Sequence, residues 1–214
     1  MKSLMVKDML ILKGQRKTFL LLIFVCLSLC FINDSSFALG YLGLFAALLS
    51  LGTLSYDDYD NGYAFLFTLP VTRKMYIYGK YVFCLIVVAI GTLLGMAFSI
   101  VSLETKNTFY LFSDVIIDAI ATIIVSMVMV GTMIPFRVKY GNENGRTVSG
   151  IVLGFLFASA IILKNMFPKA SSWLLEKGLS MSPTVLGVIA MAIGIIVIII
   201  TLMISIRIIE KKEY

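Results

Sequence analysis

Asp114 and Asp118 stand four residues apart in an otherwise apolar part of the sequence. Because an α-helix has about 3.6 residues per turn, both side chains lie on one face of a helix. A carboxylate inside a membrane costs about 2.5–3.5 kcal/mol near the bilayer centre and is a candidate for function. The pair can act as a proton relay or attract cationic cargo. Alternatively, it reaches water at the outer surface or pairs with Lys106, Lys164 or Lys169.

The longest polar segment in the first half of the chain, residues 56–74, separates two apolar runs. It begins with three carboxylates and an Asn-Gly pair, which favour a turn: Asp57, Asp58, Asp60, Asn61 and Gly62. A compact apolar block follows directly: Tyr63, Phe65, Leu66 and Phe67. We expect this segment to hold a small aromatic knob outside the membrane.

Pro70 marks the end of this block. Proline fixes its own φ and biases the preceding residue, Leu69, away from the helical region. The pattern predicts one or two helical turns that end at Leu69. Thr72 is then placed to cap the next helix, although Met75 occupies the position where a capping box has Glu or Gln.

Motifs of common enzymes are absent from the sequence. It contains no His, which excludes His-based triads and zinc sites of the HExxH kind, and no phosphate-binding loop that ends in Gly-Lys-Ser or Gly-Lys-Thr. We therefore expect no catalytic residue, no metal site and no cofactor bound by this chain. Cys26, Cys30 and Cys84 are interpreted as small membrane-packing residues with reduced thiols.

The composition indicates a polytopic membrane protein. Hydrophobic residues make up 60% of the chain and charged residues 14%, whereas soluble proteins average about 45–50% and about 25%. The net charge of +6 does not indicate nucleic acid binding, because the basic residues flank apolar runs instead of gathering on a soluble face.

Six charge-free runs approach or exceed the roughly 17 residues that can span the hydrocarbon layer. They are residues 18–33, 35–56, 81–103, 119–136, 147–163 and 178–206. We expect the fourth span to begin upstream, near Phe109, and so to carry Asp114 and Asp118 into the membrane. The predicted fold is a single all-α membrane domain, residues 1–214, with six transmembrane helices.

The first 17 residues form a basic, imperfectly amphipathic segment. Met5, Met9 and Leu12 are predicted to share one helical face, while Lys2 and Lys13 snorkel at its edge. We interpret the segment as a helix that lies in the cytoplasmic interface of the membrane.

The distribution of Lys and Arg predicts the orientation of the chain. With the N-terminus in the cytoplasm, fourteen basic residues lie inside: Lys2, Lys7, Lys13, Arg16, Lys17, Arg73, Lys74, Lys80, Arg137, Lys139, Arg146, Arg207, Lys211 and Lys212. Four lie outside: Lys106, Lys164, Lys169 and Lys177. This bias places the loops 57–80 and 137–146 and the tail 207–214 in the cytoplasm.

The outer connection 164–184 carries Pro168, the only Trp (Trp173) and Pro183. It is predicted to be either a loop anchored by an interfacial Trp or a re-entrant hairpin that helps gate a path.

The stretch Leu69-Pro70-Val71-Thr72-Arg73, followed by Gly79-Lys80, closely resembles the Leu-Pro-Val-Ser-Arg…Lys pattern of permease subunits of type-2 ABC exporters. The amphipathic start of the chain and the hairpin-like fifth-to-sixth connection are also similar to that family. Two positions depart from the family pattern. Three Asp residues stand where Glu is frequent after the second span, and Thr72 stands where Ser is usual.

The resemblance implies two permease copies, or two similar permeases, joined to two ABC ATPase subunits that bind ATP and magnesium. The short helix near 61–69 is then the coupling helix. The ATPase-coupling residues are Asp57, Asp58, Asp60, Asn61, Gly62, Tyr63, Phe65, Leu66, Phe67, Leu69, Pro70, Thr72 and Arg73. The aromatic side chains of the helix are expected to seat in a groove of the ATPase, or else to anchor in the inner leaflet. The function expected is outward transport of an amphipathic or hydrophobic cargo across the bacterial plasma membrane.

The cargo itself stays open among peptide, lipid and drug. The compact chain is similar to the small permeases that export phenol-soluble modulins of staphylococci, which favours peptide. Two other functions stay open: a proton-coupled secondary transporter that uses Asp114 and Asp118, and a membrane scaffold that transports nothing.

Overall fold

The computed structural model describes residues 2–32, 35–58, 62–66, 68, 71–106, 112–141, 144–145, 147–148, 150–152, 154 and 183–211. Within these ranges every helix or strand assigned is an α-helix, which confirms the predicted all-α class. The elements are α1 (Lys2–Gly14), α2 (Arg16–Ile32), α3 (Ser35–Asp58), α4 (Gly62–Leu66), α5 (Arg73–Lys106), α6 (Phe112–Tyr140) and α9 (Pro183–Lys211).

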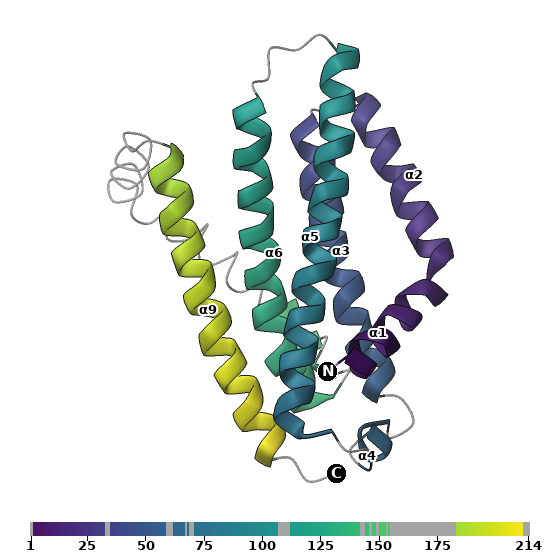
Figure 1. Cartoon of the computed structure of the whole chain (residues 1–214), viewed down its shortest axis with the longest axis vertical. Helices are drawn as coiled ribbons and strands as arrows, with labels where there is room; N and C mark the ends of the chain where they lie inside the picture. Colours follow the sequence, from purple (N-terminus) through teal and green to yellow (C-terminus); the bar gives the residue numbers. More distant parts are fainter. Residues whose placement is uncertain are drawn as a thin grey trace.

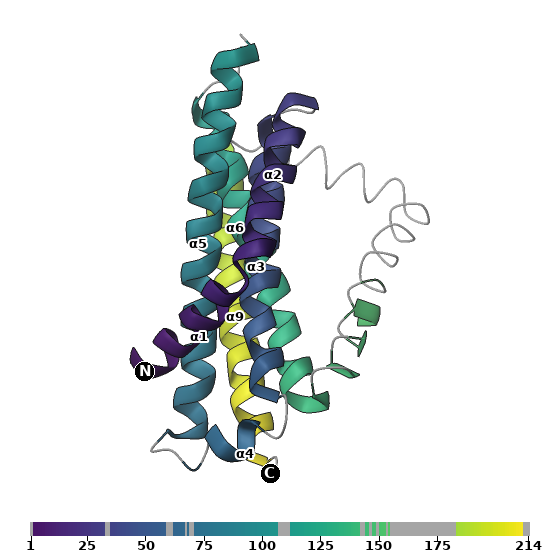
Figure 2. The same cartoon turned by 90° about the vertical axis from the view of Figure 1, so that its right-hand side faces the viewer.

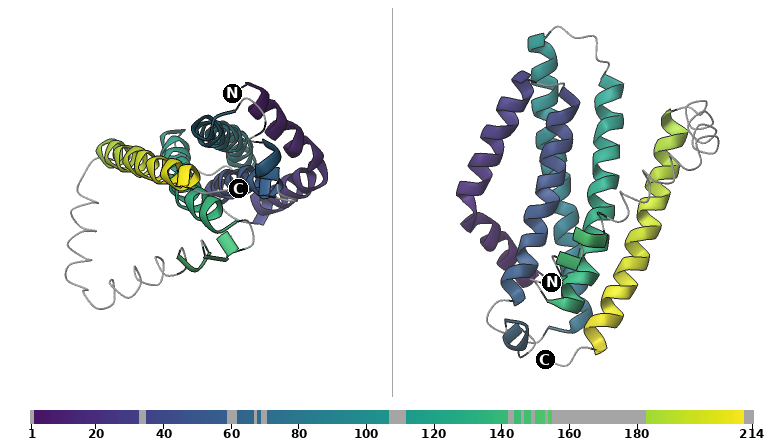
Figure 3. Two further views of the ribbon diagram at one scale, coloured as in Figure 1. Left: turned by 90° about the horizontal axis from the view of Figure 1, so that it is seen from below. Right: turned by 180° about the vertical axis from the view of Figure 1, so that it is seen from behind.

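Helices α3, α5 and α6 form the centre of the bundle, with α2 on one side and α9 on the other (Figure 1). The view from the α4 end and the view from behind show the same order, with α9 far from α1 and α2 (Figure 3). The short helix α4 lies at the end of the bundle where α5 begins and α9 ends. Segments distant in the sequence therefore meet beside α4.

Four helices in the described residues are long and apolar enough to cross a membrane, over residues 38–58, 73–101, 115–140 and 187–211. They correspond to the second, third, fourth and sixth predicted runs. The first run coincides with α2, a 17-residue apolar helix that is short for a span. The fifth run, 147–163, lies mostly outside the described residues, as does the outer connection 164–184 up to residue 182. Six spans therefore stay a prediction.

Helix α5 is long enough to extend beyond a bilayer. Its 34 residues correspond to about 51 Å at 1.5 Å per residue, against about 30 Å of hydrocarbon. The charge-free run 81–103 accounts for the hydrocarbon layer, so the first two turns, with Tyr76 and Lys80, project beyond it at the α4 end.

Two glycines hold α5 close to α3. A Cβ atom added at Gly91 would lie 2.3 Å from Cβ of Ala46, and one at Gly95 would lie 2.9 Å from Cα of Leu39. Because these glycines are four residues apart, they form one small-residue strip that lets the two backbones approach, as is common in membrane helix pairs. This packing sets the α3–α5 pair that supports α4.

Helix α1 slants across α5 and α3 before the chain turns at Gln15 into α2 (Figure 2). Its buried face consists of Leu4, Asp8 and Leu12, spaced by four residues. Met9, which was predicted to share a face with Leu12, is 66% exposed, whereas Leu12 is 8% exposed, so the protein core covers only part of that predicted face. Apolar residues occupy both sides of α1, so the pattern alone did not select the inner one.

Candidate functional site: a buried charge cluster beside α4

Lys80 is the centre of a buried cluster that joins three helices. Its ammonium group lies 2.7 Å from Oδ1 of Asp8 on α1, 2.7 Å from Oδ2 of Asp57 on α3 and 3.1 Å from Oγ1 of Thr53. Lys80 and Asp8 are each only 2% exposed. An ammonium group has three N–H donors, and here each has an acceptor. The charge is buried but satisfied.

Asp57 is the second centre of the cluster. Its Oδ1 accepts a hydrogen bond from Lys7 on α1, and its Oδ2 accepts one from the hydroxyl of Tyr76 at 2.8 Å. Lys7 also lies 3.6 Å from Oδ1 of Asp8. Two carboxylates and two ammonium groups together carry no net charge, which is the condition under which burial of ions is tolerated. We refer to Lys7, Asp8, Asp57, Tyr76 and Lys80 as the charge cluster.

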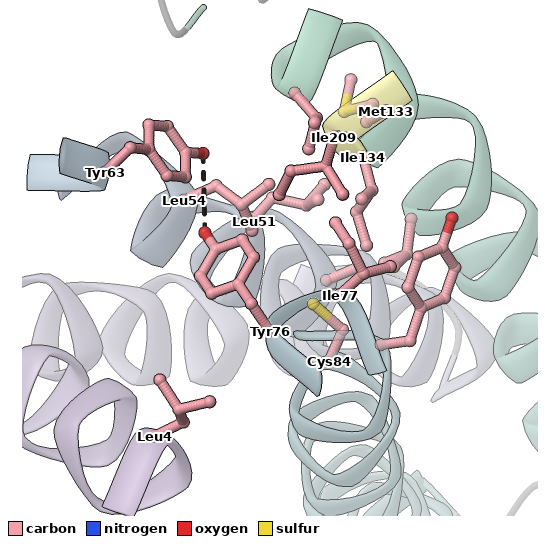
Figure 4. Close-up of a cluster of buried hydrophobic side chains, with 14 of the residues drawn as sticks. Leu4, Leu51, Leu54, Tyr63, Tyr76, Ile77, Cys84, Met133, Ile134 and Ile209 are labelled. Atoms are coloured by element: carbon pink, nitrogen blue, oxygen red, sulfur yellow. Dashed lines mark hydrogen bonds between the residues drawn. The ribbon is translucent and has the colours of Figure 1, made fainter. Parts of the chain in front are cut away.

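The charge cluster continues into α4 through two tyrosines. The rings of Tyr63 and Tyr76 meet edge to face, with centroids 5.7 Å apart, and their hydroxyl oxygens are 3.5 Å apart (Figure 4). Tyr63 and Leu66 of α4 are 3% and 6% exposed, in the same apolar core as Leu51 and Leu54 of α3. Both side chains therefore anchor α4 to the bundle.

Gly62 allows α4 to approach α3. A Cβ atom at this position would lie 2.6 Å from the carbonyl oxygen of Asp57, a backbone atom that cannot move away easily. The Asn-Gly pair was predicted to favour a turn, but the requirement at Gly62 is one of space. Any larger residue forces α4 away from the end of α3.

Thr72 and Arg73 connect the loop to two long helices. Oγ1 of Thr72 accepts a hydrogen bond from the backbone N–H of Met75 at 3.3 Å, which confirms the predicted N-cap of α5. Arg73 donates from Nη1 to the carbonyl oxygens of Ile209 and Glu210, at 3.3 and 3.0 Å. Since helix C-termini carry unsatisfied carbonyls and partial negative charge, the guanidinium group stabilises the end of α9.

A second arginine fixes α6 against α3 at the same end of the bundle. Arg137 is buried and donates from Nη1 to the carbonyl oxygen of Leu51 at 2.6 Å. Gly141 follows α6 with a φ of +77°, a conformation that favours glycine after a helix. Helices α1, α3, α5, α6 and α9 are thus joined at this end by polar contacts as well as by apolar packing.

The structure changes one part of the predicted site. Tyr63 and Leu66 were expected in an outward aromatic knob, but they face the core because this is where the short helix buries apolar area. The helix ends at Leu66, three residues before the predicted end. Asp60, Asn61, Phe67, Leu69 and Pro70, and the side chain of Phe65, lie outside the described residues.

Asp57 and Asp58 occupy different environments although they are adjacent. Asp57 is buried within the charge cluster. Asp58 is half-buried, and one of its carboxylate oxygens lies near Gly141. Asp114 and Asp118 both fall in the first two turns of α6, and Asp118 is half-buried. The side chain of Asp114 lies outside the described residues, so the role of this pair stays a prediction.

Sequence reasoning did not single out Asp8 and Tyr76. Asp8 is the only acidic residue in the first 17 and lies one helical turn from Leu4 and from Leu12, which is a weak signal for an inward-facing carboxylate. Burial raises the pKa of Asp8 above its ordinary 3.8, against the opposing effect of Lys80. Its partner Lys80 is 72 residues away, a separation that no local pattern reports.

The charge cluster is suited to holding helices together. Its central groups are almost completely buried, so no substrate reaches them, and their donors and acceptors are engaged with one another. Among the residues that the structure describes, no three carboxylate or thiol side chains are grouped to hold a metal ion. The arrangement fixes the relative positions of α1, α3, α4 and α5.

Residues 3–210 match the family model of the ABC-2 family transporter protein. Since the match covers nearly the whole chain, this protein belongs to the ABC-2 transporter family: it is an integral membrane permease component of an ABC transporter. Such a component is not itself catalytic, and the family as a whole works with an ABC ATPase. Searches of curated proteins and of solved structures gave no match.

Proposed function

We propose that this chain is the permease subunit of an ATP-driven exporter and that α4 is its coupling helix. The observation that carries this proposal is the attachment of α4. The helix is only five residues long, yet its inner side chains Tyr63 and Leu66 are buried against the ends of α3 and α5. A helix this short has little stability of its own, so its position depends on the bundle.

The contacts of α4 provide a route for displacement into the membrane helices. Tyr63 contacts Tyr76 of α5, Tyr76 bonds Asp57 of α3, and Arg73 bonds the end of α9. A load applied to α4 by a partner therefore reaches α5 and α3 through buried contacts, and reaches α9 through the more exposed hydrogen bond of Arg73. With Tyr63 and Leu66 facing inward, we assign the ATPase contact to the aromatic residues Phe65 and Phe67.

The remaining assignments rest on the sequence. The charge bias places the α4 end in the cytoplasm, and the ATPase subunits that bind ATP and magnesium dock there. A second permease, identical or related, completes the transporter. We favour outward movement of an amphipathic peptide across the bacterial plasma membrane, as in the phenol-soluble modulin exporters, with lipid or drug as other cargoes. Asp114 and Asp118 contribute to a path for cationic cargo.

Copurification with the ATPase tests this function. The affinity-tagged chain is expressed in its native host, extracted in mild detergent and analysed for a retained ABC ATPase by mass spectrometry. Retention is expected for the unmodified chain and for Gly14→Ala, because an added Cβ at Gly14 meets nothing within 4 Å. Gly62→Ala should displace α4 and reduce retention at least tenfold.

A double substitution tests the ATPase contact that we assign to Phe65 and Phe67. Phe65→Ala with Phe67→Ala should lower ATPase retention while leaving membrane insertion unchanged, since aromatic residues dominate many interfaces. Wild-type retention in this variant would show that the aromatics only anchor in the membrane. Transport by the chain alone under a proton gradient would instead support a secondary transporter.

A further inference from the structure

The N-terminal helix is joined to the bundle by two ion pairs, Lys7 with Asp57 of α3 and the buried Asp8 with Lys80 of α5. Asp8 lies between Leu4 and Leu12 on the inner face of α1, and its partner Lys80 is two turns into α5. Leu4 belongs to the core cluster that also contains Tyr63 and Tyr76. One face of α1 thus touches the structure that holds the coupling helix.

The ion pair fixes the register of α1 against its neighbours, which apolar packing alone does not do. Leucine side chains pack against a neighbouring helix in several registers, because dispersion contacts are individually weak and not directional. An ammonium group with all three donors engaged allows one register, since any slide of α1 removes the acceptor Asp8 and leaves a buried charge short of a partner. A leucine at position 8 would suffice if packing were the only requirement.

We propose that Asp8 is a positioning residue. Through Lys80 it locks α1 to the ends of α3 and α5, so that α1 moves as one body with these ends and with α4 during the ATP cycle. The second part of this proposal rests on the proposed function. Val6, Met9 and Leu10 of α1 lie outside the inner face and are exposed. Through Asp8, a displacement of the coupling helix reaches these apolar residues and hence the membrane surface.

Distances between spin labels on α1 and α5 test the proposal. Cysteines replace Met9 and Tyr78, two exposed residues, in a chain whose native cysteines are changed to alanine. The chain is placed in lipid nanodiscs alone and with its copurified ATPase, nucleotide-free and vanadate-trapped. With aspartate at position 8, we expect one narrow distance distribution that is the same in all states.

Asp8→Asn should widen this distribution at least twofold, already in the chain alone, because the ion pair is intramolecular. Asp8→Glu keeps the carboxylate and should restore a narrow distribution. Lys13→Gln is the matched control: it removes one charge from an exposed position of the same helix and should change nothing. If Asp8→Asn folds poorly, Asp8→Leu with Lys80→Met keeps apolar volume without charge and should also give a wide distribution.

Three results overturn the proposal. A narrow distribution in Asp8→Asn, even with a lower melting temperature, would show that Asp8 stabilises the fold but does not position α1. A narrow distribution in Asp8→Leu with Lys80→Met would show that packing alone sets the register. A shift of the α1–α5 distance on vanadate trapping of the parent chain would show that α1 moves separately. If the parent chain retains no ATPase, the proposed function and the movement of α1 during the ATP cycle are both refuted. The distances measured in the chain alone still decide whether Asp8 positions α1.

Discussion

Arg73 and Glu210 are 137 residues apart, and the guanidinium group of the first donates to the backbone carbonyl oxygen of the second at 3.0 Å. Arg73 is the first residue of α5, and Glu210 lies in the last turn of α9. The start of α5, which directly follows the loop that carries α4, is therefore bonded to the end of α9. This contact assigns to the arginine of the Leu-Pro-Val-Thr-Arg stretch a role within the permease itself.

Arg73→Met should loosen the end of α9. Loss of a charged donor from helix carbonyls that are partly solvated should cost about 1 kcal/mol, or about a fivefold loss of exchange protection. Hydrogen exchange of peptides that cover residues 200–211 measures the effect. Lys74→Met, which removes only the exposed pair with Glu210, serves as control and should have little effect. Unchanged exchange in Arg73→Met would contradict the capping role.

Lys80→Met should be strongly destabilising on its own. It leaves two buried carboxylates with only Lys7 as a cation, and removal of one partner of a buried pair costs about 3–5 kcal/mol. Adding Asp8→Leu should recover more than half of the loss, because the remaining Asp57 keeps Lys7 and Tyr76. The free energy of unfolding in mixed micelles, measured for both variants, tests this. Additive losses in the double variant would refute the pairing.

The stability of the chain should depend on pH through Asp8. Burial raises its pKa above 3.8, so between 3.8 and the folded value the folded state binds more protons than the unfolded state. Stability contributed by this group therefore increases as pH falls through that window and is lost as pH rises through the folded pKa. The melting temperature of the parent chain should rise relative to Asp8→Asn as the pH falls toward 3.8. A relative fall over that range would contradict the sign.

Gly95→Ala should weaken the α3–α5 pair. Its Cβ would lie 2.9 Å from Cα of Leu39, a backbone atom, so the helices must separate. Such overpacking costs about 1–3 kcal/mol. Gly40→Ala is the control, because a Cβ at Gly40 meets nothing within 4 Å. Unfolding in mixed micelles should separate the two variants, and equal stability would show that the strip of glycines is not needed for close approach.

Local physics made several features predictable from the sequence. Long charge-free runs indicated membrane helices, because an apolar segment of sufficient length has only the bilayer or a core in which to be buried. Pro70 and Thr72 marked the start of α5, since both act through the backbone of neighbouring residues. The Leu-Pro-Val-Thr-Arg stretch pointed to the family that the model of residues 3–210 identifies.

Other features depended on which helices pack together. In a membrane, residues that face lipid and residues that face protein are both apolar, so periodicity does not select the inner face of a helix. For this reason Met5, Met9 and Leu12 were predicted to share one face, although the core buries Leu12 and leaves Met9 66% exposed. The inward direction of Tyr63 likewise follows from Tyr76 and the end of α3, which a local reading of residues 62–66 does not contain.

The sequence by itself determined that this chain is a membrane protein with a short helix between two spans, because length, hydropathy and turn residues act over a few neighbours. Its resemblance to a known family pointed to a permease. Only the tertiary structure decided that Asp8 and Asp57 converge on Lys80, because these residues lie on three different helices. Their meeting depends on the crossing of α1 over α5 and on the close approach of α3 and α5 at Gly91 and Gly95. A buried charge selects its partner by distance in space, and that distance is set by the packing of whole helices.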